Sequence, residues 1–577
     1  MKKQLILGNA AVARGLYEAG CKYVSSYPGT PSTEITENAA KYNEIHTEWA
    51  PNEKVALESA IGASVAGARA FSAMKHVGLN VAADPLFTVS YTGVNGGLVI
   101  AVADDPAMHS SQNEQDSRNY AIASKIMMLE PSDSSECLEF TKIAFELSEK
   151  FDTPVLLRLS TRIAHSQSLV DLSERTEIGL KPYEKNDAKY IMKPANAIKR
   201  HPIVEARQKA IAEFAETSSL NVIEKGSSKL GIITAGTSYN YAKEVFGENA
   251  SFLKLGIVNP LPAKLIKDFA SSVERVIVIE ELDDVIETFC KKIGISCDGR
   301  NLLPNIGEYS QELLSELLLN EKNDYISFEE NIPVRPPIMC PGCPHRGTFY
   351  VLKKLGLSVC GDIGCYTLGS APPLGAVDTT VCMGASVSML HGFNTVSPEL
   401  RNKRVAVIGD STFVHSGITS LIDIVYNKSF STVLVLDNNI TGMTGHQQNP
   451  CTGLTLKNEP TKALKIEEIC KACGVDRIFI VDPNEMSELE KLLKQELAID
   501  DQTSVIIVRR PCALLKCVPK DKHFKVDSDK CKSCKNCMKI GCPALSMQDK
   551  KAKIDSTLCI ACGLCEQMCH FDAIKKA

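Results

Sequence analysis

The residues VAVIGDS (405–411) and VLVLDNNI (433–440) decide the fold of this chain. Each is a short apolar run that ends in polar residues, as do the buried strands of a parallel sheet. The carboxyl ends of such strands open at one edge, so Asp410 and Asn438, which are 28 residues apart, are expected side by side. Their oxygens and the Ile440 carbonyl suit Mg²⁺, which completes its shell with phosphate and water. The stretch therefore predicts a magnesium and diphosphate site.

Similar apolar runs alternate with helical stretches through most of the chain. They lie at residues 5–7, 99–102, 154–157, 230–233, 276–279 and 505–508. Short buried strands separated by helices predict parallel, doubly wound α/β sheets. A polar stretch at 181–201 and a second one at 320–324, followed by prolines at 333–337, are expected to be linkers. We therefore expect α/β units with the following bounds: 1–180, 195–325 (smaller) and 335–518, before an α+β tail at 520–577.

The tail holds eight of the 22 cysteines within its last 47 residues. They form two runs, Cys531, Cys534, Cys537, Cys542 and Cys559, Cys562, Cys565, Cys569. Three cysteines at two-residue intervals followed by a fourth are typical of a two-cluster ferredoxin domain, in which the fourth binds the other [4Fe–4S] cluster. We therefore expect one cluster on Cys531, Cys534, Cys537 and Cys569, and the other on Cys542, Cys559, Cys562 and Cys565. Residues 525–528 (KVDS) return as 553–556 (KIDS), so the tail is an internal repeat.

Two other interpretations of the tail cysteines fit the pattern less well. Zinc sites take paired CxxC motifs rather than triplets, and a disulfide framework is rare in a reducing compartment. The first run does depart from the ferredoxin pattern, because four residues rather than three separate Cys537 from Cys542. Pro543 nevertheless follows Cys542 as that pattern expects.

Composition narrows the possible functions. The 577 residues are 44% hydrophobic and 23% charged with a net charge of −5, which is ordinary for a globular protein and gives no reason to expect nucleic acid. We expect no membrane span and no signal peptide, because no apolar run is long enough. The many thiols favour a reducing cytoplasm. From Lys516 onward Lys outnumbers Asp and Glu, but two clusters would cancel most of this charge, so a solvated lysine face explains it equally well.

The two quoted stretches resemble the motif of thiamine diphosphate enzymes, GDG followed further along by Asn-Asn. Ser411 replaces the final glycine here, as in some members that oxidise 2-oxo acids with ferredoxin. The resemblance implies that Gly409, Asp410 and Ser411 bind the cofactor with Asn438 and Ile440, and that Asp410, Asn438 and the Ile440 carbonyl hold Mg²⁺.

Enzymes of that kind need a second domain that grips the aminopyrimidine ring, and residues 1–180 are expected to supply it. Residues 52–69 resemble the helix of that domain that begins with a catalytic glutamate. We choose Glu53 over Glu58 because it stands just before the helix. The resemblance implies that Glu53 bonds N1′ of the cofactor and helps it lose its C2 proton. Without the family, Glu53 is an acid in a first helical turn, favoured by the dipole.

Two further segments resemble the ferredoxin-dependent branch of these enzymes. Residues 27–34 (YPGTPSTE) look like its substrate loop, in which Thr30 would bond the carboxylate or carbonyl of a 2-oxo acid. Thr30 is also a plausible helix cap, with Pro31 in the first turn. Residues 104–116 look like an active-site loop, although the roles of its side chains are not assigned by the sequence.

The resemblance extends over nearly the whole chain, to the alpha subunits of the indolepyruvate ferredoxin oxidoreductase family. It implies two thiamine diphosphate-binding domains, a smaller middle domain and a two-cluster ferredoxin-like tail, in that order. It also implies the reaction of an arylpyruvate with coenzyme A to give an acyl-CoA and CO₂, with two electrons passing to ferredoxin. A small beta subunit would complete the enzyme, as an alpha2beta2 assembly.

A third [4Fe–4S] cluster is a separate question. Cys340 and Cys343, in a CxxC motif, together with Gly364-Cys365 and Cys512, resemble the ligand segments of a cluster close to the thiamine in related enzymes. Pro344-His345-Arg346 replaces the small residues usual after this CxxC. Free thiols lining the cofactor pocket and a zinc site remain alternatives.

Three rival functions also remain open. A related 2-oxo acid oxidoreductase of other substrate preference, or a non-oxidative thiamine decarboxylase, would share the cofactor residues; the decarboxylase would release an aldehyde without an electron acceptor or coenzyme A. An electron-transfer adaptor without catalysis would bind no thiamine, and the presence of Glu53, Asp410 and Asn438 argues against it.

Overall fold

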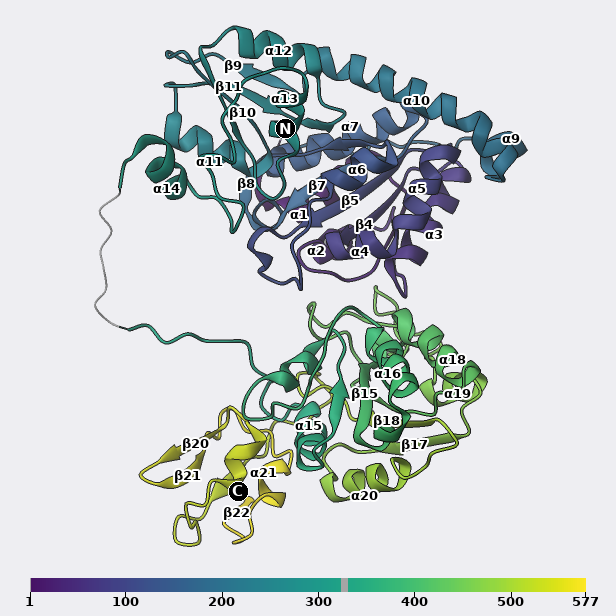
Figure 1. Cartoon of the computed structure of the whole chain (residues 1–577), viewed down its shortest axis with the longest axis vertical. Helices are drawn as coiled ribbons and strands as arrows, with labels where there is room; N and C mark the ends of the chain where they lie inside the picture. Colours follow the sequence, from purple (N-terminus) through teal and green to yellow (C-terminus); the bar gives the residue numbers. More distant parts are fainter. Residues whose placement is uncertain (1, 323–330) are drawn as a thin grey trace. The chain divides into compact units, whose positions relative to one another are not determined.

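The computed structural model describes residues 2–322 and 331–577. The chain divides into two compact units, residues 1–329 and 330–577 (Figure 1). The second expected linker lies partly outside the described residues, at 323–330. Among the helices in the described part of the chain, none combines the length and apolar character needed to cross a bilayer.

The first unit is built on a seven-stranded sheet. Its order is β12 (Ile257–Asn259), β6 (Met127–Leu129), β7 (Val155–Ser160), β5 (Leu98–Asp104), β4 (Ala70–Lys75), β2 (Tyr23–Ser26) and β3 (His46–Trp49). All neighbours are parallel except the edge strand β12, which runs antiparallel to β6. The doubly wound α/β fold expected for this part of the chain is therefore confirmed.

Side chains of alternate residues in β5 enter two cores. Val99 and Ala101 face the core formed with α1 (Gly8–Glu18) and α7 (Ser134–Phe151), whereas Ile100 and Val102 face the core that includes residues of α3 (Glu53–Val65) and α5 (Ala83–Thr92). A strand buried on both faces needs this continuous apolar sequence. Further helices of this part are α2 (Thr33–Ala39), α4 (His76–Val81), α6 (Arg118–Ser124), α8 (Thr161–His165) and α9 (Asp187–Tyr190).

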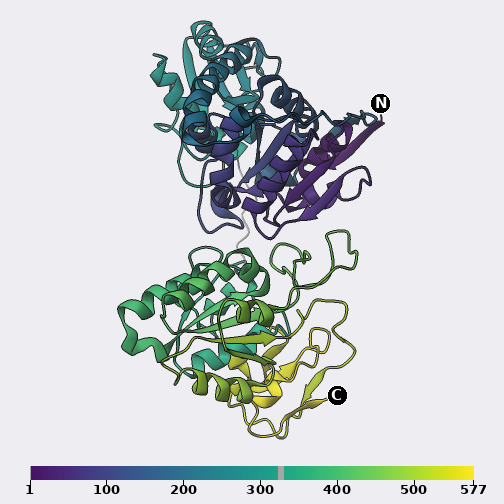
Figure 2. The ribbon, with the colours of Figure 1, turned by 90° about the vertical axis from the view of Figure 1, so that its right-hand side faces the viewer.

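A smaller sheet follows in the same unit, after the long helix α10 (Pro194–Thr217), which contacts α5 and α12 (Ala263–Ser271) (Figures 1 and 2). Its order is β13 (Arg275–Ile279), β10 (Leu230–Ala235), β11 (Ser251–Leu255) and β9 (Val222–Glu224), with β9 antiparallel. The remaining elements of the unit are β1 (Lys2–Leu7), paired with β8 (Gln167–Leu172), α11 (Gly236–Phe246), α13 (Val285–Lys292) and α14 (Gln311–Leu314). Because β12 comes from this later part but completes the first sheet, the segments expected at 1–180 and 195–325 share one unit.

The second unit contains a five-stranded parallel sheet. Its order is β14 (Ser358–Cys360), β15 (Arg404–Gly409), β16 (Thr432–Asp437), β18 (Ser504–Arg509) and β17 (Arg477–Val481). One face packs on α16 (Ala385–Val396), α18 (Ile418–Tyr426) and α19 (Ile466–Ala472). The other face packs on α15 (His345–Lys354) and α20 (Met486–Glu496).

The tail is a ferredoxin-like arrangement of two antiparallel strand pairs. They are β19 (Phe524–Val526) with β22 (Ile574–Lys576) and β20 (Leu545–Gln548) with β21 (Lys551–Ile554), and α21 (Leu564–Gln567) lies between β21 and β22 in sequence. Phe524, Ile540, Leu564 and Ile574 are buried in the same hydrophobic core as α15 and α20. The tail is therefore packed onto one face of the second unit.

Candidate active site

The expected diphosphate residues lie together at the carboxyl edge of the second unit's sheet. Gly409 in β15 pairs with Leu436 in β16, so Asp410 and Asp437 leave neighbouring strands at the same level. Asp410 and Asn438 are buried, at 2% and 8% exposure. The Ile440 amide donates to Asn438 Oδ1 over 3.1 Å, which folds the loop after β16 back on itself. Both strand-end motifs thus meet where a parallel sheet binds ligands.

The electrostatics of this edge favour a cation. Burial and, to a smaller extent, the Asp437 carboxylate together raise the pKa of Asp410 to about 7, against the lowering effect of a hydrogen bond from Asn449 Nδ2 at 3.3 Å. A divalent ion would stabilise the ionised carboxylate that burial disfavours. The donor set of one carboxylate, one amide and one carbonyl is made of hard oxygens, so these residues fit Mg²⁺.

His345 orients the Asn438 amide. Burial lowers the pKa of His345 to about 4, so the imidazole is neutral near pH 7. Its Nε2 lies 3.3 Å from Asn438 Nδ2 and accepts from it, which points the Asn438 oxygen away from the ring. The sequence showed His345 only as an odd residue after the CxxC. Its role, like that of Asn449, becomes visible only through contacts between distant segments.

Four cysteines gather beside this edge. Burial raises the pKa of Cys343 to about 12 and that of Cys365 to about 11, and the charge of Cys340 adds to both effects. Cys512 also feels the charge of Cys340, and its amide donates to the Asn438 carbonyl over 2.9 Å. The four cysteines that the sequence proposed for a third cluster thus lie within range of one another's charge, and Cys512 contacts Asn438, one of the expected diphosphate residues.

Gly364 and Cys365 lie against the loops that carry the diphosphate residues. A Cβ on Gly442 would lie 3.4 Å from Cys365 Sγ. Tyr366, the next residue, packs so closely on Gly409 that a Cβ there would lie 2.6 Å from its ring. Gly409 is therefore needed for the close approach of these segments.

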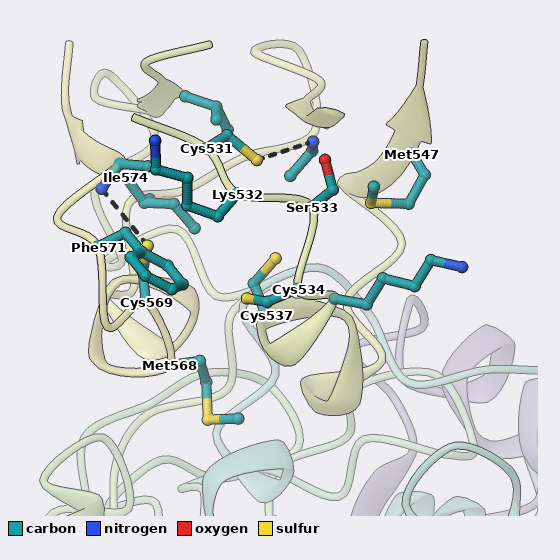
Figure 3. Close-up of a pocket in the computed structure, with 14 residues that line it drawn as sticks. Cys531, Lys532, Ser533, Cys534, Cys537, Met547, Met568, Cys569, Phe571 and Ile574 are labelled. Atoms are coloured by element: carbon teal, nitrogen blue, oxygen red, sulfur yellow. Dashed lines mark hydrogen bonds between the residues drawn. The ribbon is translucent and has the colours of Figure 1, made fainter. Parts of the chain in front are cut away.

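The tail cysteines line two cavities. Each cavity is lined by the four cysteines expected for one cluster, which are three of one run and the fourth of the other run. One cavity is lined by Cys531, Cys534, Cys537 and Cys569, and the other by Cys542, Cys559, Cys562 and Cys565. In Figure 3 the four thiols of the first set surround the cavity from several chain segments. Within residues 2–322 and 331–577, no three Cys, His, Asp or Glu side chains converge on a single-ion site. A cubane binds each thiolate at a different iron, so a ring of cysteines around a cavity fits it.

Main-chain amides bond the cavity sulfurs in a repeated pattern. The Ala552 amide donates to Cys531 Sγ over 3.5 Å, and the Phe524 amide donates to Cys559 Sγ over 3.4 Å (the first is drawn in Figure 3). The two bonds are related by the sequence repeat, because both donors and both acceptors differ by 28 residues. Such bonds to sulfur influence the reduction potential of a cluster.

Arg346 connects the CxxC segment to the tail. Its side chain is buried and lines the second cavity together with Pro341 and Gly342. Its Nε donates to the Cys340 carbonyl over 3.1 Å. The charges of Cys340, Cys343, Cys542 and Cys562 all act on this guanidinium, although burial dominates and lowers its pKa. The fixed positive charge lies where cysteines of two proposed clusters approach each other.

In the first unit, Glu53 opens helix α3 and is buried, at 4% exposure, whereas Glu58 one turn later is exposed. The Asn52 side chain caps the helix by accepting from the Val55 amide over 2.9 Å. A Cβ on Gly78 would lie 2.6 Å from Glu53 Oε1, so the carboxyl lies directly over α4. The buried position favours the choice of Glu53 over Glu58.

The polar loop at 104–116 has two different parts. Asp104 is fully buried and accepts from Arg158 Nε over 2.8 Å, and Asp116 forms an ion pair with Arg118 at 2.5 Å, so both act in the core. Ser110 instead reaches the expected substrate loop, because its hydroxyl donates to the Thr30 carbonyl over 3.3 Å. Only the middle of the loop thus lies beside Thr30.

Comparison with known proteins identifies these parts. Three family models match: pyruvate flavodoxin/ferredoxin oxidoreductase, thiamine diphosphate-binding, at residues 14–224; the thiamine pyrophosphate enzyme C-terminal TPP-binding domain at 362–508; and the 4Fe–4S binding domain at 552–575. The chain thus contains thiamine diphosphate-binding domains and an iron–sulfur domain.

Curated relatives match over their whole length. Indolepyruvate oxidoreductase subunit IorA of Archaeoglobus fulgidus is 39% identical, covering 100% of this chain and 98% of that protein, and that of Pyrococcus abyssi is 41% identical, covering 100% and 97%. The 2-oxoglutarate synthase subunit KorA of A. fulgidus is 25% identical and covers 53% of this chain and 97% of that protein. A solved 2-oxoglutarate:ferredoxin oxidoreductase from Magnetococcus marinus aligns with 18% identity and a TM-score of 0.48, over 55% of this chain and 65% of that one.

The full-length identity to the IorA subunits agrees with the order of domains and with the residues at the sheet edge and in the tail. These relatives are themselves named as subunits. The chain therefore belongs to the indolepyruvate oxidoreductase IorA family and is the alpha subunit of a 2-oxo acid:ferredoxin oxidoreductase.

Proposed function

We propose that this subunit oxidises arylpyruvates, indolepyruvate among them, with coenzyme A. One arylpyruvate and one coenzyme A thiol give one arylacetyl-CoA, one CO₂ and one proton, and two electrons reduce two ferredoxins. The observation that carries the proposal is the 39–41% identity over the whole chain to relatives named for indolepyruvate. The 2-oxoglutarate synthase subunit KorA is only 25% identical and matches 53% of the chain, which favours the aromatic substrate class.

The residues of the second unit fit the diphosphate end of the cofactor. Asp410, Asn438 and the Ile440 carbonyl would hold Mg²⁺, and Gly409, Ser411, Gly364 and Cys365 would line the adjoining cofactor surface. The short distance of 3.0 Å between the hydroxyls of Thr441 and Ser411 supports this assignment, because it holds the two strand-end loops together. His345 would keep the Asn438 oxygen directed at the ion.

In the first unit, Glu53 would hydrogen-bond N1′ of the aminopyrimidine and share its proton, and Thr30 would contact the 2-oxo acid. When bound, thiamine diphosphate supplies the C2 carbanion that adds to the 2-oxo carbon and the ring that accepts the electrons of decarboxylation. A buried carboxyl over α4 suits a group that must hold one proton in a dry environment.

We also infer three clusters and an order for them. Cys340, Cys343, Cys365 and Cys512 would hold the first, because their charges act on one another and the Cys512 amide donates to the Asn438 carbonyl. The cavity lined by Cys559 borders Pro341 and Gly342 of the CxxC and would follow. The cavity lined by Cys531 would be the last, because Cys534 is exposed there and a ferredoxin would have access. Iron analysis distinguishes the counts, since twelve irons per chain correspond to three cubanes and eight to two.

The proposed assembly is an alpha2beta2 complex with the small beta subunit, and the test uses that complex. Anaerobic viologen reduction is measured with indolepyruvate, phenylpyruvate, pyruvate and 2-oxoglutarate, each with and without coenzyme A. We expect coenzyme A-dependent turnover that is fastest with the arylpyruvates. Activity confined to pyruvate or 2-oxoglutarate would overturn the substrate class. Aldehyde release without an acceptor would instead indicate a non-oxidative decarboxylase.

A further inference from the structure

Lys75 lies at the centre of the first unit's carboxyl edge. It is the last residue of β4, between β2 and β5, and pairs with Ala103 immediately before Asp104 and Asp105. Its aliphatic stem runs beneath the Thr30 loop, because a Cβ on Gly29 would lie 3.2 Å from Lys75 Cγ. The ammonium group is thus carried to the loop that is expected to hold the substrate.

The ammonium group is anchored by a neutral acceptor. Lys75 Nζ donates to the Ser110 carbonyl over 3.0 Å, and the Ser110 hydroxyl donates in turn to the Thr30 carbonyl. The bond to Ser110 uses one of the three N–H donors of a lysine. Hydrogen bonds therefore connect Lys75 to Ser110 and Ser110 to Thr30. The Lys75 ammonium group retains N–H donors for a further hydrogen bond.

The neighbouring carboxylate of Asp105 is held by other groups. It accepts from Thr161 Oγ1 at 2.6 Å, from Ser111 Oγ at 2.7 Å and from the Ser110 amide at 2.8 Å. It therefore shapes the loop that bears Ser110 and influences Lys75 only through its field. Burial lowers the pKa of Lys75, while the fields of Asp105 and Glu53 act in the opposite direction.

A half-buried cation bonded to a neutral carbonyl gains most from an anion at contact distance. We propose that Lys75 binds the carboxylate of the 2-oxo acid. The inference rests on the proposed function and adds to it the group that recognises the anionic end of the substrate. Lys75 would orient the acid with its 2-oxo carbon toward the cofactor, and the contact would disappear when the carboxylate leaves as CO₂. Nothing in its position between apolar β4 and α4 indicated this role in the sequence.

The test compares Lys75→Met, Lys75→Arg and the exposed Lys41→Met in the reconstituted alpha–beta complex. For Lys75→Met we expect the KM for the arylpyruvate to rise roughly 10- to 100-fold, the size of a lost charged hydrogen bond. The affinity for thiamine diphosphate should stay within about 3-fold of the unaltered enzyme, an allowance set by ordinary variation among such contacts. Lys75→Arg should restore part of the KM, and Lys41→Met should behave as the unaltered enzyme.

A second readout separates recognition from structure. The unaltered enzyme should be inhibited better by 3-phenylpropionate than by the neutral 3-phenylpropionamide, and Lys75→Met should lose this preference. A Lys75→Met enzyme that keeps the preference, or that loses thiamine affinity while keeping the KM, would overturn the inference and leave the proposed function standing. If the unaltered complex turns over no 2-oxo acid, the proposed function fails, and the inference fails with it.

Discussion

The Arg346 guanidinium donates a hydrogen bond of 2.6 Å from Nη1 to the carbonyl of Gly541, which lies 195 residues further along the chain. The same nitrogen lies 3.3 Å from the Ile540 carbonyl. Arg346 follows the CxxC, and Gly541 precedes Cys542, so one side chain links the segments of two proposed clusters. A buried cation at this point would stabilise the negative charge of reduced clusters.

Substitutions of Arg346 should separate its contribution to the packing of the tail from its effect on the reduction potential of the clusters. Arg346→Met should loosen the tail at a cost of roughly 2–4 kcal/mol, since it leaves several buried carbonyls unpaired. It should also lower the reduction potential of the cluster at Cys542, because a positive charge is lost. Arg346→Lys keeps the positive charge but loses the forked hydrogen bonds. It should therefore still destabilise the tail, but it should change the reduction potential less than Arg346→Met does. Hydrogen exchange at residues 540–545 and potentiometric EPR measure the two; unaltered values in both variants would contradict the assignment.

Glu53→Gln should slow turnover strongly while leaving the cofactor bound. An amide cannot share the proton of N1′, so we expect a rate loss of about 10²- to 10⁴-fold, the usual contribution of an acid–base group. The rate of C2–H exchange of the bound cofactor, followed by NMR, should fall in parallel. Glu58→Gln is the matched control on the exposed next turn of α3 and should keep its activity. Comparable losses in both variants would refute the choice of Glu53.

Asp410→Asn should weaken magnesium-dependent binding of thiamine diphosphate. The carboxylate supplies the ionic ligand of the proposed site, and losing it should cost at least about 10-fold in affinity, in line with the loss of a charged contact. Calorimetric titration of the alpha–beta complex with the cofactor, with and without Mg²⁺, measures this. The exposed Asp423→Asn serves as control. Retained Mg²⁺ dependence in Asp410→Asn would place the ion elsewhere.

Glu281 should give the first unit a pH-dependent stability. Its carboxyl is buried at 9% exposure, and burial raises its pKa to about 7, while it accepts from the Tyr309 amide over 2.8 Å. The raised pKa means that the contribution of the protonated form is complete below the unfolded pKa of about 4.3 and is lost as the pH rises through 7.

The variant Glu281→Gln keeps the acceptor without the charge. At pH 8 it should be more stable than the unaltered chain by up to roughly 3 kcal/mol, and between pH 5 and 8 its melting temperature should fall less steeply. The exposed Glu312→Gln is the control and should follow the unaltered chain. Equal pH slopes for Glu281→Gln and the unaltered chain would show that Glu281 is ionised throughout this range.

Some features were predictable because they are local or follow from symmetry. Asp410 and Asn438 meet because each ends an apolar run, and parallel strands place such ends at one edge. Each tail cavity is lined by three cysteines of one run and the fourth cysteine of the other. This exchange could be expected because the two runs belong to an internal repeat of the sequence. Central strands such as β5 and β16 were visible as continuous apolar runs buried on both faces. The same expectation was wrong for residues 5–7, because they belong to β1, which pairs antiparallel with β8 and leaves Leu5 exposed.

Other features depend on contacts that the sequence does not record. β12 has only three residues and no periodicity, yet it pairs with β6, where Ile257 lies opposite Leu129, 128 residues earlier in the chain. Lys75 looks like an ordinary residue at the end of a strand until Gly29 and Ser110 are placed around it. His345 and Arg346 departed from the usual pattern after a CxxC, and only the fold shows what each contacts.

The most direct test of the whole account is cluster reduction by substrate in the absence of an external acceptor. The anaerobic alpha–beta complex is mixed with indolepyruvate and coenzyme A and frozen for EPR, with CO₂ measured in parallel. We predict reduced [4Fe–4S] signals that appear together with CO₂, at two electrons per molecule released, and neither in Glu53→Gln. Release of CO₂ with the clusters remaining oxidised would contradict the claim that the tail carries electrons away from the thiamine site.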